Sequence, residues 1–288
     1  AASHQKKYKD SVILFYDSEF GTPPEYFKSF GIDMDRVIHT PITDVEQLKF
    51  DITNQLNDLN KDDNVCIVID SIGNLASKKE VDDAMDGKSV ADMSRAKQMK
   101  SLFRIITPHL NLKDIPLICV NHTYKEIGMF PKDIVSGGTG AYYSADAIWI
   151  IGRRQDKEGT EIKGYHFVIN IEKSRHVREK SQIPITVTFD GGIMKWSGLL
   201  EVAEKAGFVH KPKVGWYEAV NPDTGEVLTE RLMRAKDIVD NKEFWLMMFE
   251  KTSLAKHIEN VYTIASSEGL INDDTQVEIA DEETVAND

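Results

Sequence analysis

Two short apolar runs in this chain each end in an acidic residue, and this feature constrains the fold more than any other. Residues 12–16 lead into Asp17 and, two positions later, Glu19. Residues 65–69 lead into Asp70. Near-continuous apolar runs of this length predict strands that are buried on both faces, as in a parallel sheet. An acid at the end of such a strand lies at the sheet edge where α/β proteins bind ligands.

The predicted elements alternate between strands and helices up to about residue 195. Strands are expected at 12–16, 37–40, 65–69, 116–120, 147–152, 165–171 and 185–189, and helices at 23–29, 44–59 and 89–107. The helix at 89–107 is expected to stop near Pro108. This alternation predicts the α/β class, with a mostly parallel sheet covered by helices on both faces.

The pattern changes after Trp196. A helix at 198–206 is followed by a predicted hairpin of 215–220 with 226–232, around a turn at 221–225, and then by helical patterns to about residue 266. We therefore expect three parts: an α/β core at 1–195, a small α+β domain at 196–268, and an acidic, disordered tail at 269–288.

The net charge of −12 does not exclude a nucleic-acid partner, because the charge is unevenly distributed. Seven of the acids and no base lie in residues 269–288, so the rest of the chain carries a net charge of −5. No run of eighteen apolar residues exists, which predicts no membrane span. The only two cysteines, Cys66 and Cys119, lie inside apolar runs and are expected to be buried free thiols.

The acids at the strand ends suit phosphoryl transfer. Glu19 can act as the base that orients an attacking water, and Asp70 fits the Walker B position that holds Mg²⁺ through a water molecule. Asn121 and His122 follow a third strand and can hydrogen-bond a γ-phosphate and report its loss. Alternatively, Glu19 is a ribose-binding acid, which would need a G-x-G-x-x-G segment that the chain does not supply upstream, or a solvated helix cap.

The chain contains no complete phosphate loop of the form G-x-x-x-x-G-K-[ST]. Gly87-Lys88-Ser89 matches the end of that motif, but Asp82 stands where its first glycine belongs. Nearby acids would repel a phosphate, so we expect a polar loop there. Only eleven residues precede the first strand, and the sequence thus predicts an ATPase core without its front end.

Two segments are candidates for binding single-stranded DNA. The expected long loop at 123–140 holds lysines beside apolar and glycine residues: Lys125, Met129, Phe130, Lys132, Gly137 and Gly138. Lysines can hold phosphates while apolar groups contact bases. The helix at 89–107 carries a basic stripe of Lys97, Lys100 and Arg104, opposite an apolar stripe of Met93, Ala96, Met99, Phe103 and Ile106. The loop could instead be a lid or a protein contact, and the basic stripe a solvated face.

A cluster of cations follows the predicted strand at 165–171. Its members are Lys173, Arg175, Arg178 and Lys180. Cations at a strand end can reach a phosphate in a neighbouring subunit, as arginine fingers do. Alternatively, these four cations are ordinary surface charges with no ligand.

Several stretches together resemble the RecA family of DNA strand-exchange ATPases, in the form found in T-even-type phages. They are residues 15–21, 69–80, 99–105, 121–124, 137–140, 172–175 and 189–193. The resemblance covers the chain to about Leu270. It implies that Glu19 is the catalytic glutamate, Asp70 the Walker B aspartate, and Asn121-His122 the switch between γ-phosphate and DNA, although bacterial RecA has Gln where His122 stands.

The resemblance also implies binding sites and partners. Residues 77–88, with Lys78 and Lys79, match the first DNA-binding loop, and 123–136 the second. Lys173 and Arg175 match cations that reach ATP across a filament interface. The implied protein uses ATP and Mg²⁺, pairs single-stranded DNA with homologous duplex DNA, forms helical filaments, and works with a single-strand-binding protein and a loader. It would act in the cytoplasm, of an infected bacterial host if phage-encoded.

Two other functions remain open from the residues alone. One is a RecA-fold helicase, which would need a distinct arginine-finger element. The other is a non-catalytic DNA-binding piece. ATPase activity separates an enzyme from a binder, and duplex unwinding separates a helicase from a recombinase.

Overall fold

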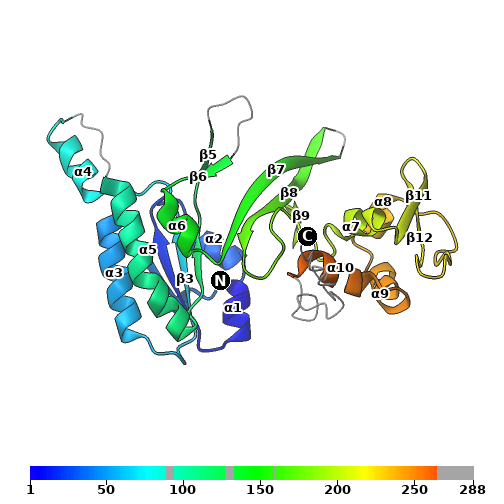
Figure 1. The fold of residues 1–288 in the computed structure, drawn as a ribbon, viewed down its shortest axis with the longest axis horizontal. Coiled ribbons are helices and arrows are strands. Elements are labelled where there is room, and N and C mark those ends of the chain that lie inside the picture. The colour runs from blue at the N-terminus through cyan, green and yellow to red at the C-terminus, as the bar shows by residue number, and fades with distance from the viewer. Residues whose placement is uncertain (89–93, 127–132, 159, 265–288) are drawn as a thin grey trace, which may run out of the picture. The chain divides into compact units, whose positions relative to one another are not determined.

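The computed structural model describes residues 1–88, 94–126, 133–158 and 160–264. The chain forms two compact units, one from Ala1 to Ala145 and one from Asp146 onward. Figure 1 shows the elements of both units.

A four-stranded parallel sheet forms the centre of the first unit. Its strands are β1 (Val12–Asp17), β2 (Val37–Pro41), β3 (Val65–Asp70) and β4 (Leu117–Cys119), in the order β2-β1-β3-β4. All three pairs are parallel. The two apolar runs that end in acids are thus neighbouring central strands. Strands that are covered by helices on both faces have near-continuous apolar sequences, as these two do.

Helices cover both faces of this sheet. On one face α3 (Val45–Asp58) and α5 (Ser94–Lys113) pack their apolar sides against β1 and β3, in a core that includes Leu48, Ile52, Ile67, Met99 and Ile106. On the other face Phe27 of α2 (Pro24–Ser29) packs with Ile13, Phe15 and Cys66. Figure 1 shows α3 and α5 side by side along the sheet. The short α1 (Ala2–Lys7) and a 3₁₀ turn, η1 (Met34–Arg36), complete the layer at the start of the unit.

The structure corrects the prediction for the helix at 89–107. Within the described residues α5 begins at Ser94 and passes through Pro108 to Lys113. Proline cannot donate the usual helical hydrogen bond, but Ile106 and Leu110 are buried on either side of it. Their packing outweighs the local cost of the proline. Of the predicted apolar stripe, Ala96 is exposed and Met93 lies outside the described residues.

Two predicted loops contain regular structure. Residues 77–88 hold the helix α4 (Lys78–Met85), whose cap Ser77 accepts a hydrogen bond from the Glu80 N–H at 3.1 Å. Ser-x-x-Glu is a helix-start pattern, so this helix had a sequence signal. The loop expected at 123–140 holds the antiparallel strands β5 (Thr123–Lys125) and β6 (Asp133–Val135) and the helix α6 (Thr139–Ser144).

The second unit begins with an antiparallel sheet, where parallel strands were expected. Its order is β10-β9-β8-β7, formed by β7 (Ala147–Glu158), β8 (Glu161–Ser174), β9 (Gln182–Thr188) and β10 (Gly192–Ile193). Parallel neighbours need a crossover of a dozen or more residues. The connections here are far shorter, so consecutive strands must form hairpins.

A small α+β group follows, around the buried Trp245. It contains α7 (Leu199–Lys205), β11 (Val209–Lys213), β12 (Trp216–Ala219), α8 (Ala235–Ile238), α9 (Lys242–Lys251) and α10 (Leu254–Tyr262). The main partner of β12 was not predicted: β12 pairs with β11 across a turn at Gly215, whose φ of 75° suits glycine. The predicted partner segment also contacts the β12 region, through antiparallel bridges between Val220 and Val227 and between Tyr217 and Met233.

The predicted fold class is confirmed: a parallel sheet with helices on both faces, followed by a small C-terminal domain. Within the described residues, no helix has the length and apolar character needed to cross a membrane.

Candidate functional site

The carboxyl ends of β1 and β3 lie level with each other in the first unit. Asp17 and Asp70 are register partners in the parallel pair. The chain after each strand is then joined to the other: the Ser18 N–H donates to the Asp70 carbonyl at 2.8 Å, and the Ser71 N–H donates to Ser18 Oγ at 2.9 Å. Glu19 and Asp70, predicted separately from sequence, are therefore brought to one sheet edge.

Glu19 is held at this edge by hydrogen bonds to one carboxylate oxygen. Its Oε1 accepts from Ser71 Oγ at 2.6 Å and from Asn74 Nδ2 at 2.7 Å. His122 Nε2 lies 3.9 Å from the same oxygen. The carboxylate is fixed by groups from the segment after β3, which is the arrangement a positioned general base needs.

Asp17, for which no role was predicted, is the most buried acid at the site, with a side chain only 2% exposed. Its Oδ1 accepts from the N–H groups of Glu19 and Phe20 at 3.0 and 2.8 Å. Its Oδ2 lies 3.0 Å from His39 Nε2 on β2. Asp17 therefore shapes the turn that presents Glu19, while Phe20 adopts a left-handed φ of 54°.

The environment of Asp70 disfavours its charge. Burial raises the pKa of this carboxyl above its usual value, and the negative charges of Glu19 and Asp17 raise it further, against a smaller opposite effect of His122. A cation beside Asp70 would relieve this cost. Mg²⁺ is commonly held by one or two carboxylates together with waters and substrate phosphates. Among the residues that the structure describes, no cluster of three or more metal-binding side chains exists.

We expect Asp70→Asn to raise the thermal stability of the protein near pH 7 in the absence of nucleotide and metal. A carboxyl with a raised folded pKa destabilises the fold at pH values above its ordinary pKa, and this penalty fades as the pH falls through the raised value. Thermal unfolding should therefore give a higher melting temperature for Asp70→Asn than for the unaltered protein near pH 7. This difference in melting temperature should disappear at acidic pH. An equal or lower melting temperature for Asp70→Asn near pH 7 would contradict the repulsion inferred here.

Asn121 and His122 leave β4 in different directions. Asn121 Nδ2 donates to the Ser136 carbonyl at 2.8 Å, which ties the end of β4 to the chain that follows β6. His122 lies against Gly73, where an added Cβ would stand 2.8 Å from the ring. Only His122 is placed beside Glu19; Asn121 instead connects the site to the hairpin of β5 and β6.

The basic stripe and the glycines of the predicted DNA site lie together. Lys97, Lys100 and Arg104 are exposed on α5. Gly140 at the start of α6 packs so closely on α5 that an added Cβ would be 2.7 Å from Lys100 Cα. Gly138, with a φ of 77°, lies near Ala96, and Gly137 has a φ of 91°. These positions require glycine for conformation and close approach.

The other predicted DNA-binding lysines differ in their surroundings. Lys78 and Lys79 are exposed on α4, where Lys79 pairs with Asp83. Lys125 pairs with Asp133 across the hairpin at 2.8 Å. Lys88, in the incomplete phosphate-loop match, pairs with Asp86 at 2.7 Å. Met129, Phe130 and Lys132 lie outside the described residues.

Lys173 and Arg175 belong to the second unit. Lys173 lies within β8, opposite Ile148 of β7, rather than after the strand as predicted. Arg175 follows the strand and its Nε donates to Asp146 Oδ1 at 2.9 Å, with 61% of the side chain exposed. An exposed guanidinium held at one nitrogen can still reach another partner.

Comparison with known proteins identifies the family. Residues 1–194 match the RecA N-terminal domain, and residues 196–258 match the C-terminal domain of the bacteriophage T4 recombination and repair protein. The chain belongs to the RecA family.

Individual relatives agree with this membership. The chain is 50% identical over 268 residues to the recombination and repair protein of Enterobacteria phage T4, covering 92% of this chain and 68% of that relative. It is 26% identical to protein RecA of Streptomyces coelicolor over 217 residues, and 26% identical to protein RecA of Tropheryma whipplei over 238 residues. These matches span 56% and 53% of the two bacterial proteins.

In this RecA-family chain the sequence-predicted site is only partly assembled. The first unit brings Glu19, Asp70 and His122 to one edge and places Gly138 beside the α5 stripe. Ser71, Asn74, Asp17 and His39 also take part, and sequence reasoning missed their roles. Only Asp17 had a local signal, because an Asp two residues before the site acid commonly bonds the backbone of the following turn.

Proposed function

We propose that this chain is the greater part of an ATP-dependent DNA recombinase that assembles on single-stranded DNA, pairs it with homologous duplex DNA and exchanges strands. The observation that supports this most is the Glu19 carboxylate, held at 2.6 Å by Ser71 and 2.7 Å by Asn74 beside His122. A candidate general base and the imidazole of His122, a candidate γ-phosphate sensor, lie at one sheet edge of the unit that also carries the candidate DNA contacts on α4 and α5.

The described residues supply part of what ATP hydrolysis needs. Glu19 can accept a proton from an attacking water through Oε2, since Oε1 is already bonded, and Asp70 can help to hold Mg²⁺, which stabilises phosphate charge when bound. A backbone cradle for the β- and γ-phosphates is not among these residues, because the sequence has no complete phosphate loop. We therefore expect residues 1–288 alone to have no ATPase activity.

The test uses two proteins. One is residues 1–288 alone, and the other, the extended chain, carries these residues behind an N-terminal segment that supplies a RecA-family phosphate loop. We expect ATP turnover stimulated by single-stranded DNA only in the extended chain, and none with Asp70→Asn in it. An extended chain that is folded and binds DNA without hydrolysing ATP would favour the non-catalytic binding function. ATP-driven duplex unwinding would favour a helicase.

The same protein would bind DNA through the α5 stripe. Lys100→Ala in the extended chain should lower the slope of log affinity against log salt by about one unit, because it removes one phosphate contact. Lys125→Ala should lower it less, since Lys125 already pairs with Asp133. Equilibrium binding to single-stranded DNA at several salt concentrations measures both slopes. An unchanged slope for Lys100→Ala would show that the basic stripe is a solvated face that makes no phosphate contact.

We further propose that Lys173 and Arg175 act on the nucleotide of a neighbouring copy, and that a single-strand-binding protein and a loader assist assembly in the cytoplasm of an infected host. The exposed guanidinium of Arg175 supports the proposal that these cations reach a neighbouring copy.

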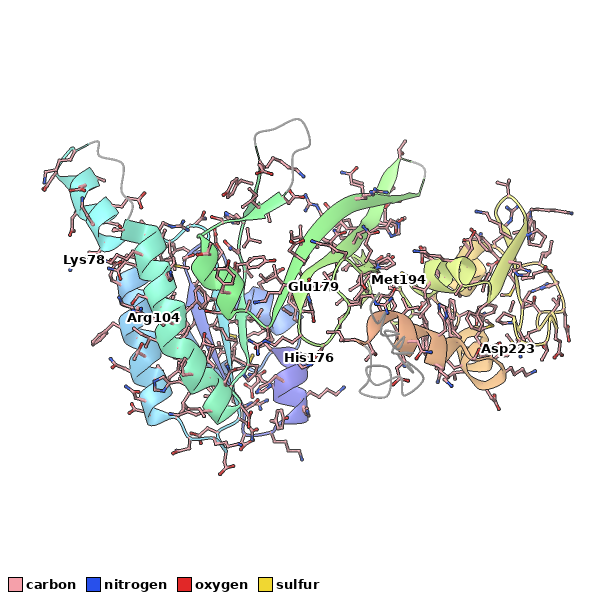
Figure 2. The ribbon with its side chains drawn as sticks, viewed as in Figure 1. Lys78, Arg104, His176, Glu179, Met194 and Asp223 are labelled. Atoms are coloured by element: carbon pink, nitrogen blue, oxygen red, sulfur yellow. The ribbon has the colours of Figure 1, made fainter. Side chains whose placement is uncertain are left out.

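Figure 2 labels Lys78 and Arg104, two candidate DNA contacts on α4 and α5 of the first unit.

A further inference from the structure

Arg95 lies in the first turn of α5, and its guanidinium is bonded to main-chain oxygens of a distant segment. Its Nε donates to the Leu75 carbonyl at 2.6 Å. Its Nη2 donates to the carbonyls of Ile72 and Gly73 at 3.0 and 2.8 Å. One side chain therefore holds three carbonyls of residues 72–75, the segment that follows β3.

The segment held by Arg95 carries two groups of the candidate site. Asn74 donates to Glu19 Oε1 at 2.7 Å. Gly73 lies directly against the His122 ring. The carbonyls on both sides of Asn74 are bonded to Arg95, so Arg95 sets where the Asn74 side chain stands. The neighbouring Ser94 adds a second link, because its Oγ donates to Ser77 Oγ, the cap of α4, at 2.8 Å.

We propose that Arg95 is a positioning residue for the hydrolytic site. It fixes residues 72–75 so that Asn74 holds Glu19 and Gly73 backs His122, and it connects this arrangement to α5. The inference rests on the proposed function, since it gives a role in ATP turnover to a residue that acts through residues 72–75. DNA bound along Lys97, Lys100 and Arg104 would act on α5, the helix whose first turn contains Arg95. This offers a short mechanical route from DNA to Glu19.

The chemistry of the side chain explains why arginine stands here. A guanidinium is planar and carries five N–H donors in a rigid fork, so it can serve three carbonyls at once. An ammonium is a compact point charge with no such fixed geometry. Arg95→Lys is therefore expected to keep the charge and lose the positioning.

Arg36 supplies a matched control in the same unit. It also caps main chain, with Nη1 donating to the Lys9 carbonyl at 2.8 Å, and Nε bonds Asp33 at 2.9 Å. Lys9 precedes β1 and Asp33 precedes β2, so neither partner belongs to residues 72–75. Loss of Arg36 should lower stability in the same manner as loss of Arg95, without moving Asn74.

The experiment measures ATP turnover of the extended chain with single-stranded DNA. Arg95→Lys and Arg95→Ala should lower kcat by about 10- to 100-fold, as a misplaced catalytic group does, with KM changed less than about twofold. Arg36→Ala should keep kcat within about twofold. In an Asn74→Ala background the further effect of Arg95→Lys should be clearly smaller, because both changes loosen the hold on the same Glu19 carboxylate. Unchanged kcat in Arg95→Lys, or an equal loss in both backgrounds, overturns the proposal.

A second readout does not depend on turnover. The proton signals of the His122 ring, followed by NMR in the nucleotide-free protein, should shift in Arg95→Lys and stay in place in Arg36→Ala. Unshifted signals in folded Arg95→Lys overturn the positioning role. An unaltered extended chain without DNA-stimulated turnover would instead reject the proposed function, and the His122 signals would still decide whether Arg95 positions the segment.

Discussion

Glu19→Gln in the extended chain should lower ATP turnover by about 10²- to 10⁴-fold while ATP and DNA binding persist, because a positioned base contributes about this factor. Gln keeps the size of the side chain and an oxygen that can accept from Ser71 and Asn74, so the local hydrogen bonds survive. Only the ability to take a proton is lost. Steady-state turnover, together with separate nucleotide- and DNA-binding measurements, shows whether the loss lies in kcat.

Asn74→Ala is the matched comparison for this prediction. It leaves the base in place and removes one of the groups that hold it, so its effect on kcat should be smaller than that of Glu19→Gln. If Glu19→Gln loses nucleotide binding but keeps its turnover per bound nucleotide, Glu19 would have a structural role and would not be the general base.

Arg175→Ala should abolish turnover of the extended chain and leave the fold intact, if the guanidinium serves the nucleotide of a neighbouring copy. An arginine supplied by a second subunit can contribute about 10³- to 10⁵-fold to phosphoryl transfer. Asp146→Asn is the control, because it removes the partner of Arg175 at 2.9 Å while keeping the arginine, and turnover should persist.

Mixing two inactive variants tests this trans arrangement. Arg175→Ala subunits retain Glu19, and Glu19→Gln subunits retain Arg175, so some mixed interfaces regain one complete site. Recovered turnover on single-stranded DNA is the expected result. A mixture that stays inactive, although both variants assemble on the DNA, would show that the two residues do not act across an interface.

The strands and core of the first unit could be predicted because their signals are local. The runs at 12–16 and 65–69 are apolar at consecutive positions, and the acids after them mark the strand ends. The helix α3 was also predictable, since Asp44 caps its start by accepting from the Gln47 N–H at 2.8 Å. Local periodicity and capping determine such elements.

Other features depend on contacts that sequence spacing does not reveal. The antiparallel order of β7 to β9 could have been inferred from the short connections, but the strands were assigned to the parallel sheet by analogy with the first half. Ser71 and Asn74 meet Glu19 across more than fifty residues of sequence. Arg95 reaches carbonyls twenty or more residues away, and no local pattern marks such a partner.

Strand exchange is the measurement that tests the central claim most directly. The extended chain is incubated with single-stranded DNA and a homologous duplex, and the transfer of the labelled strand is followed. We predict transfer that requires ATP and homology, falls in Arg175→Ala, and is absent with heterologous duplex. ATP hydrolysis stimulated by DNA without any homology-dependent strand transfer would contradict assignment of this site to a recombinase.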